Sequence, residues 1–312
     1  MIRRPHNRRR LAVSAAITLF WLAMMALLVR NYVLPLRASA AALPLASGQL
    51  AGNWRDFEEW MSLRVGEKSD GVSYTLVEQR EDGGDFLAAN RTWLDLDLLG
   101  ARHAFRLETV ALLDPQFALQ CATVVLRIDD TPLQFKTLVT PRRLLYRLEF
   151  EGQVHVGAQP LKGPVSLLEA VRPLVAQRLE LAVGRVYRLP VFDSTWSLRQ
   201  GVAEIRVEAL DDIPFQGQMV QAYRVVTQLG PHASTAWVTG VGIVLRREFS
   251  NIVMERVNAS WARRRFKGID APILEPQVAP EEFEAATGRE GSLANEIGPL
   301  NLLLRLFGPK QH

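Results

Sequence analysis

Cysteine is almost absent from this chain: Cys121 is the only one among 312 residues. No disulfide can form within the chain, so a folded domain must be held together by the burial of apolar side chains. The five histidines are scattered, with no His-x-x-x-His pair and no Cys/His cluster. Zinc sites need closely spaced nitrogen and sulfur ligands, so the sequence predicts no metal site and no cofactor.

Acidic residues are missing from the first thirty positions, where six arginines give the chain its basic character. Removing these six from the formal net charge of +4 leaves −2 for the rest of the chain. The body of the protein is therefore close to neutral. A basic terminal segment that sets membrane topology explains the charge better than a nucleic-acid-binding arm, and we expect no nucleic acid among the partners.

One long apolar run stands out, residues 11–29, which contain no charge. A helix of this length spans roughly 28 Å, about the thickness of a hydrocarbon core. The positive-inside rule places residues 1–10 in the cytoplasm and the rest across a bacterial inner membrane, in the periplasm. A cleaved signal peptide is the alternative, because Ala38-Ser39-Ala40 fits a cleavage site. The uncleaved, single-pass anchor is favoured, since Arg30 and Arg37 lie between the run and that site.

The following part of the sequence, residues 55–260, alternates short apolar segments with turn residues. Residues 86–98 are typical, because Trp93, Asp95 and Asp97 alternate with leucines. This pattern puts one face of a strand into a core and the other into water. About a dozen such segments predict a mainly β fold, a large curved antiparallel sheet or an open barrel. The expected strands are residues 60–65, 72–80, 86–98, 102–113, 117–128, 133–139, 143–150, 153–156, 186–192, 202–210, 219–229, 234–238 and 243–249.

One segment departs from the strand pattern and predicts a helical insertion. Residues 167–179 have apolar side chains near a helical period, and Ser166 with Glu169 fits a capping box. Pro173 should kink or split this helix.

The expected organisation is a basic N-terminus, an anchor, a tether, a periplasmic β-rich domain and a tail. The boundaries are residues 1–10, 11–29, 30–54, 55–260 and 261–312. The tail has regularly spaced prolines, which predicts an extended or loosely ordered chain. It ends in residues 299–307, a short apolar helix that is too short to span a membrane.

A glycine pair, Gly240 and Gly242, has the spacing of a phosphate-binding turn. Such a turn needs a strand before it and a helix N-terminus after it. The residues that follow Gly242 are β-branched and apolar, and the third glycine of the dinucleotide fingerprint is missing. The pair therefore predicts a hairpin turn that uses glycine for its positive φ.

Cys121 is the candidate nucleophile. Three histidines are candidate bases for it, namely His103, His155 and His232. On a strand covering residues 117–128, Cys121 shares a face with Phe117, Leu119 and Val125, which is the expected core face. Burial raises the pKa of a thiol and makes it unreactive, so a structural cysteine is favoured.

Four carboxylate pairs and one arginine run are the remaining candidates. The pairs are Asp95/Asp97, Asp129/Asp130, Asp211/Asp212 and Glu281/Glu282. The first is expected on the polar face of a strand. The second and third are expected in turns, where aspartate accepts hydrogen bonds from backbone amides. The run Arg263-Arg264-Arg265 could meet lipid headgroups or an acidic partner, but a solvated charge run after the last strand is favoured.

Two stretches carry a resemblance to a known family: residues 184–196, GRVYRLPVFDSTW, and residues 221–249, QAYRVVTQLGPHASTAWVTGVGIVLRREF. They resemble the β-rich periplasmic domain that accompanies some bacterial transglutaminase-like proteins, and residues 59–68 resemble its opening strand. The resemblance covers residues 55–257 and rests on packing and turn motifs. It implies a membrane-anchored β domain beside a transglutaminase-like partner. It implies no catalytic residue, because the domain with the catalytic Cys, His and Asp has no counterpart in this chain.

The sequence thus favours a non-catalytic, membrane-anchored binding or accessory module of the bacterial cell envelope, with an envelope protein or an apolar ligand as partner. One alternative is a carrier or scaffold for lipid or lipoprotein, with the ligand in a cleft of the curved sheet. A second is a hydrolase that uses Cys121. We expect no catalytic, cofactor-binding or metal-binding residue.

Overall fold

A computed structural model describes residues 43–44, 56–66, 70–80, 84–98, 101–129, 131–167, 180–193 and 199–286. The chain divides into two compact units, residues 1–43 and 44–312, and the second is described below. The predicted anchor, residues 11–29, lies outside the described residues and stays a prediction. Among the residues that the structure describes, no helix is both long and apolar enough to cross a membrane.

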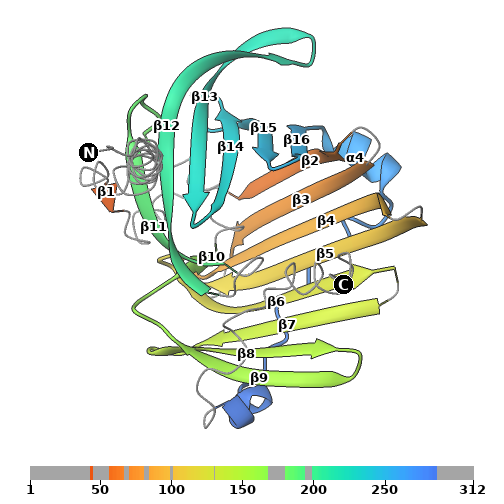
Figure 1. The fold of residues 1–312 in the computed structure, drawn as a ribbon, viewed down its shortest axis with the longest axis vertical. Coiled ribbons are helices and arrows are strands. Elements are labelled where there is room, and N and C mark those ends of the chain that lie inside the picture. Colours follow the sequence, from red (N-terminus) through yellow and green to blue (C-terminus); the bar gives the residue numbers. More distant parts are fainter. Residues whose placement is uncertain are drawn as a thin grey trace, which may run out of the picture. The chain divides into compact units, whose positions relative to one another are not determined.

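The second unit is built on one large, mainly antiparallel sheet (Figure 1), so the prediction of a mainly β fold is confirmed. A short strand β1 (Leu43–Pro44) lies at the boundary of the two units. The strands of the first half are β2 (Phe57–Val65), β3 (Asp70–Gln79), β4 (Phe86–Leu98), β5 (Ala101–Leu113), β6 (Leu119–Ile128), β7 (Thr131–Val139), β8 (Arg143–Phe150) and β9 (Gln153–Pro160). Those of the second half are β10 (Ser166–Leu167), β11 (Val186–Asp193), β12 (Arg199–Phe215), β13 (Gln218–Leu229), β14 (His232–Val238), β15 (Val244–Phe249) and β16 (Ile252–Arg256).

The hydrogen-bonded order runs β11-β12-β13-β14-β15-β16-β2-β3-β4-β5-β6-β7-β8-β9. Most neighbours in the sheet are also neighbours in sequence, because hairpin turns connect them. The exception is the junction of β16 with β2, where Arg256 lies opposite Met61. The last described strand thus pairs with the first long one, and this pairing joins the two halves into a single sheet.

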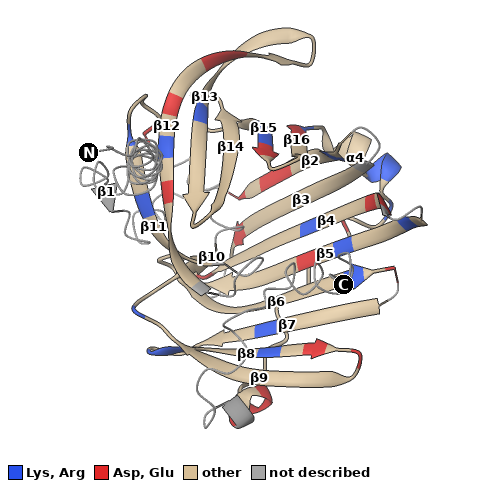
Figure 2. Ribbon diagram, viewed as in Figure 1, with Lys and Arg blue, Asp and Glu red and all other residues tan. Residues whose placement is uncertain are grey.

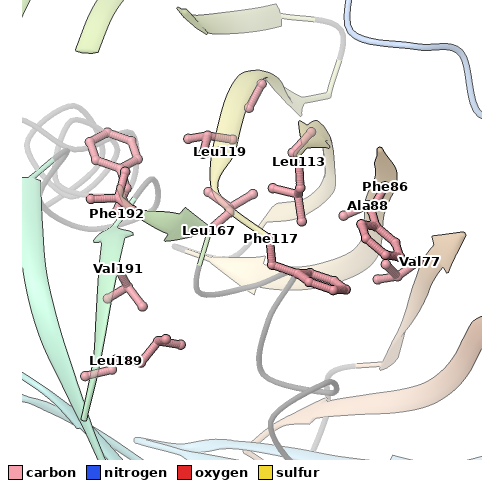
Figure 3. Packing of buried hydrophobic residues seen from close by; sticks show 14 of the residues in the cluster. Val77, Phe86, Ala88, Leu113, Phe117, Leu119, Leu167, Leu189, Val191 and Phe192 are labelled. Carbon is pink, nitrogen blue, oxygen red and sulfur yellow. The ribbon is translucent and has the colours of Figure 1, made fainter. Parts of the chain in front are cut away.

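The sheet curls, and one face of both halves packs into a single apolar cluster. Val77, Phe86 and Leu113 come from the first half, and Leu189, Val191 and Phe192 come from the second (Figure 3). We call this face the inner face and the opposite one the outer face. Alternation along each strand sends every second side chain to the inner face, as the sequence pattern indicates.

The short strand β10 ties the start of β6 to strand β11. The backbone amide of Leu119 donates to the carbonyl of Val165 at 2.7 Å, and β10 itself pairs in parallel with β11. The hydroxyl of Ser166 is buried and donates to the carbonyl of Phe117 at 2.7 Å. The predicted capping role of Ser166 is therefore wrong, because Ser166 lies in a strand and its side chain closes a tertiary contact. Residues 168–179, the remainder of the predicted helix, lie outside the described residues.

The chain leaves the sheet through helix α4 (Ala259–Arg265), where the side chain of Asn258 accepts from the amide of Trp261 at 2.7 Å. It then crosses the outer face, behind β3 to β8 in Figure 1, and ends in the 3₁₀ helix η4 (Pro280–Ala286). We call residues 266–286 the strap. The tail is thus extended over this part and packed on the sheet, whereas residues 299–307 lie outside the described residues.

Candidate functional site on the inner face

Polar side chains form a compact group on the otherwise apolar inner face. Glu59 of β2 lies opposite Thr75 of β3, which lies opposite Asn90 of β4, which in turn lies opposite Thr109 of β5. Residues directly opposite one another in a sheet point to the same face. The next row adds Ser73 and Thr92. The site therefore spans four adjacent strands.

Asn90 is the hub of the hydrogen bonds in this group. Its Nδ2 donates to the hydroxyl of Ser73 at 3.0 Å and to that of Thr75 at 2.9 Å. The hydroxyl of Thr92 donates to Asn90 Oδ1 at 3.1 Å. Such a network fixes the rotamers of its members, because each buried polar group is costly when it is left without a partner.

Glu59 lies at the charged centre of the site and is only 1% exposed to solvent. Arg247 Nη2 donates to Glu59 Oε2 at 2.8 Å. Arg256 Nη1 lies 3.8 Å from Oε1, which is too far for a hydrogen bond. Among the described residues, Oε1 of Glu59 has no hydrogen-bond partner. One carboxylate and two guanidinium groups give this site a net positive charge and one acceptor oxygen that is not used.

A β-bulge brings Arg247 to the inner face. Trp237 lies opposite Arg246 whereas Val238 lies opposite Val244, so one extra residue is inserted into β15. The insertion puts Arg247 on the same face as Val244 and leaves Arg246 on the outer face, 5.6 Å from the ring of Trp237. Simple alternation would have placed Arg246 inside, so the pairing of Arg247 with Glu59 could not be predicted from the sequence. The readable signal was Glu59, an acid in phase with Phe57 and Met61 on the apolar side of β2.

A second bulge places Cys121 on the outer face. Leu113 lies opposite Leu119, but Leu112 lies opposite Cys121, so Gln120 is the inserted residue. The expectation that Cys121 shares the core face with Phe117 and Leu119 is wrong for this reason. Burial raises the pKa of the Cys121 thiol, a hydrogen bond with the backbone of Leu112 lowers it, and the charge of Glu275 in the strap raises it; the net effect is a raised pKa. Few thiolates are therefore available at neutral pH.

The three candidate bases lie away from Cys121 in the sheet. His103 is nine residues from Leu112 along β5, roughly 30 Å at the rise of a strand. His155 lies on β9, and strands β7 and β8 lie between β9 and the strand of Cys121, β6. His232 lies on β14 in the other half. Within the described ranges, no group of three or more His, Cys, Asp or Glu side chains could hold a metal ion.

The first carboxylate pair and Asp129 of the second behave as expected, whereas Asp130 lies outside the described residues. Asp95 accepts from Arg102 at 3.2 Å and from Arg106 at 3.1 Å on the outer face of β4. Asp129 lies in a turn, where its carboxylate accepts from the amide of Ala104 at 3.0 Å. The pKa of Asp129 is lowered, most by this backbone hydrogen bond and next by the hydrogen bond with His103.

The third pair is not in a turn, so that expectation is wrong. Asp211 and Asp212 lie within β12, which continues to Phe215 before the chain turns (Figure 2). Asp211 accepts from Trp237 Nε1 at 3.1 Å and lies 3.7 Å from Arg224. The partner strand β13 makes this extension possible, and no local pattern reveals it.

The glycine pair does form a hairpin turn between β14 and β15. Gly242 has φ +80° and donates its amide to the carbonyl of Thr239 at 2.9 Å. The arginine run lies in α4, where Arg263 pairs with Asp270 at 2.9 Å and stacks 5.5 Å from the ring of Trp60. The glycine turn lacks the helix N-terminus of a phosphate-binding turn, since strand β15 follows Gly242.

Comparison with known proteins finds solved structures of low similarity. No family model and no curated protein matches this chain. One similar solved structure is a beta-barrel-like protein of the domain of unknown function DUF1849 from Brucella abortus, with 11% identity and a TM-score of 0.48 over 64% of this chain and 95% of that one. Another is a DUF1089 family protein from Pseudomonas aeruginosa, with 14% identity and a TM-score of 0.25 over 62% and 91%. At these values neither structure bears on function.

Replacing Cys121 with serine should leave the fold and the cellular function intact. Cys121 is half-buried, so the new hydroxyl can keep a contact with water, and we expect a loss of at most about 1 kcal/mol in the free energy of unfolding. Denaturant unfolding and complementation of a deletion strain measure the two effects. Complete loss of function with unchanged stability would instead support a hydrolase that uses this thiol.

Proposed function

We propose that this protein is a non-catalytic binding module of the bacterial cell envelope, anchored in the inner membrane by residues 11–29, with its ligand site on the inner face. The observation that carries the proposal is the cluster of Glu59, Arg247 and Arg256, which we call the Glu59 group. A buried ion pair adds little net stability compared with apolar side chains of the same size. A fold that keeps one carboxylate and two arginines inside its sheet is therefore more readily explained by recognition than by stability.

The composition of the inner face favours an amphiphilic ligand, in line with the lipid or lipoprotein carrier as second candidate. Two partly buried apolar side chains border the polar group on the same face, since Leu107 lies opposite Thr92 and Met254 lies opposite Arg247. Arg256 is 28% exposed in its side chain, so its guanidinium is the accessible charge of the group. A ligand with an apolar body and an acidic head would match both parts.

The hydrolase alternative and the transglutaminase-like partner have unequal support. Two observations weigh against a catalytic thiol: the pKa of Cys121 is raised, and Cys121 lies far from the three histidines in the sheet. A transglutaminase-like partner follows only from the sequence resemblance of residues 55–257. Its presence in a pull-down from cross-linked membranes would test that part of the proposal.

The ligand site can be tested with 1-anilinonaphthalene-8-sulfonate, an apolar anion whose fluorescence rises on binding. We expect the purified full-length protein to bind it, and Arg256→Gln to weaken binding about tenfold, as the loss of a charge-assisted contact of about 1.4 kcal/mol implies. Arg206→Gln is the control, because Arg206 lies on the outer face beside Glu204 and Glu208. Equal binding by both variants would contradict an inner-face site.

Membrane topology is tested separately. A reporter that is active only outside the cytoplasm should be active when it is fused after His312. Protein extracted from membranes should retain residues 11–29 by mass spectrometry. A soluble mature chain that begins near Ala41 would show that the segment is a cleaved signal peptide.

A further inference from the structure

The strap covers the outer face in two separate places. Its first part packs Ile269 on Trp60 and Val72, and Ile273 on Leu87 and Val110. Its last part, residues 278–283, packs Val278 and Phe283 on β7, β8 and β9. The side chains beneath this last part are Leu138, Leu145, Val156 and Ala158.

The first part is held firmly through its backbone. Arg91 donates to the carbonyls of Ile269 at 3.1 Å and Pro272 at 3.2 Å, and also to that of Ala271. Arg91 is itself buried and fixed by Glu108, whose Oε1 accepts from Nε at 2.7 Å. One guanidinium thus satisfies three carbonyls, and releasing them would leave buried N–H donors of Arg91 without these acceptors, although Glu108 would still pair with its charge.

In the last part, Phe283 and Glu282 add to the contact made by Val278. Phe283 is only 1% exposed against Leu145 and Ala158. Glu282 accepts from Lys136 Nζ at 2.9 and 2.8 Å and lies 3.9 Å from Arg147. Burial raises the pKa of Glu282, but the hydrogen bonds from Lys136 and the amide of Ala279, with the charges of Lys136 and Arg147, lower it overall, so its carboxylate is charged at neutral pH.

The two parts are joined by a stretch that contributes little to packing. Leu274 is 74% exposed, and Glu275 reaches Arg80 through a surface ion pair of 2.8 Å. An exposed pair of this kind contributes only about 0.2–1 kcal/mol. The strap also forms no strand, so no ladder of hydrogen bonds holds it. Local opening of the last part would therefore leave the first part in place, because Arg91 holds it.

We propose that the outer face of β7, β8 and β9 is a binding site for an extended peptide of another protein, in which an acidic residue precedes an aromatic one, and that residues 278–283 occupy this site as an intramolecular ligand. Buried aromatic anchors and acidic residues bound by clusters of cations both recur in peptide recognition. When Glu282 leaves, Lys136 loses the carboxylate that it contacts, and Arg147 keeps its ion pair with Glu149 at 3.1 Å. The bared surface is then apolar with an excess of positive charge, and this favours an acidic segment.

The test uses a fluorescent peptide with the sequence of residues 276–286, PQVAPEEFEAA, and the full-length protein. In the wild type the tethered strap competes at a high effective concentration. Phe283→Ala removes the anchor of the strap, and we expect this variant to bind the peptide at least tenfold more tightly than the wild type does. Leu274→Ala, an exposed position of the same strap, should behave like the wild type. A peptide with alanine in place of its phenylalanine should not bind.

The reactivity of Cys121 provides an independent readout of strap detachment. Cys121 lies opposite Leu138, which packs against the cluster that contains Phe283, and the charge of Glu275 in the strap raises the pKa of its thiol. In Phe283→Ala the thiol should react faster with an alkylating reagent, and saturating peptide should slow the reaction again. Glu282→Gln should show the same pattern more weakly, and it serves if Phe283→Ala fails to fold. If neither variant binds the peptide more tightly than the wild type, the strap is a permanent part of the core and the proposal is wrong. The site lies on the face opposite to the Glu59 group, so this result is independent of the dye-binding test.

Discussion

Replacing Arg247 with alanine is expected to lower the free energy of unfolding by about 3–5 kcal/mol, the cost of leaving a buried charge without its partner. Arg247 makes the 2.8 Å hydrogen bond to Glu59, and the remaining arginine, Arg256, lies 3.8 Å away. Glu59 cannot turn to water at 1% exposure. Chemical denaturation monitored by tryptophan fluorescence measures the change.

The neighbouring residue is the matched control. Arg246→Ala removes an arginine from the outer face of the same strand, where it pairs with Glu248 at 2.9 Å through Nε and is partly exposed. Exposed pairs contribute about 0.2–1 kcal/mol, so this variant should lose far less stability. The double variant Glu59→Met/Arg247→Met should recover most of the loss, since apolar side chains can replace a buried pair. Equal losses for Arg246→Ala and Arg247→Ala would contradict the buried charge.

Phe117→Ala is expected to cost about 3–5 kcal/mol, as for other fully buried aromatic side chains. The side chain of Phe117 is 0% exposed, and its ring stacks on that of Phe86 with centroids 4.1 Å apart (Figure 3). Its carbonyl also accepts the hydroxyl of Ser166, so the residue links the turn before β6 to β10. Phe215→Ala, a partly buried phenylalanine near the end of β12, should cost clearly less.

The backbone of Phe117 allows a second comparison at the same position. Its φ is +62°, a conformation that glycine adopts without strain and other residues avoid. Phe117→Gly and Phe117→Ala both remove the ring, but only the glycine variant relieves the backbone. The free energy of unfolding of the glycine variant should therefore equal that of the alanine variant or exceed it by up to about 1 kcal/mol. A glycine variant that unfolds more easily would show that the turn carries no such strain.

Much of the fold could be predicted from the sequence because strand periodicity and turn chemistry are local. The bounds of β4 and β8 follow from the alternation of residues 86–98 and 143–150. Gly242 was readable as a turn residue, and Asp129 as an aspartate that binds a backbone amide, since each acts within a few residues of its own position. The prediction of a turn at Asp211 was wrong because it also used only local residues. A pair of aspartates is typical of a turn, but pairing with β13 holds these two in a strand.

The alternation, the turns and hence a mainly β domain follow from the sequence alone, whereas tertiary contacts select which side chains meet. Single inserted residues in β15 and β6 reverse the alternation, so Arg247 points inward to Glu59 and Cys121 points outward to the strap. Neither bulge leaves a local pattern, because the partner strand selects it through its own register. The pairing of β16 with β2 and the three carbonyls held by Arg91 are likewise contacts between distant residues. Their free energy arises only when the sheet has curled and brought those residues together, so no stretch of the sequence contains it.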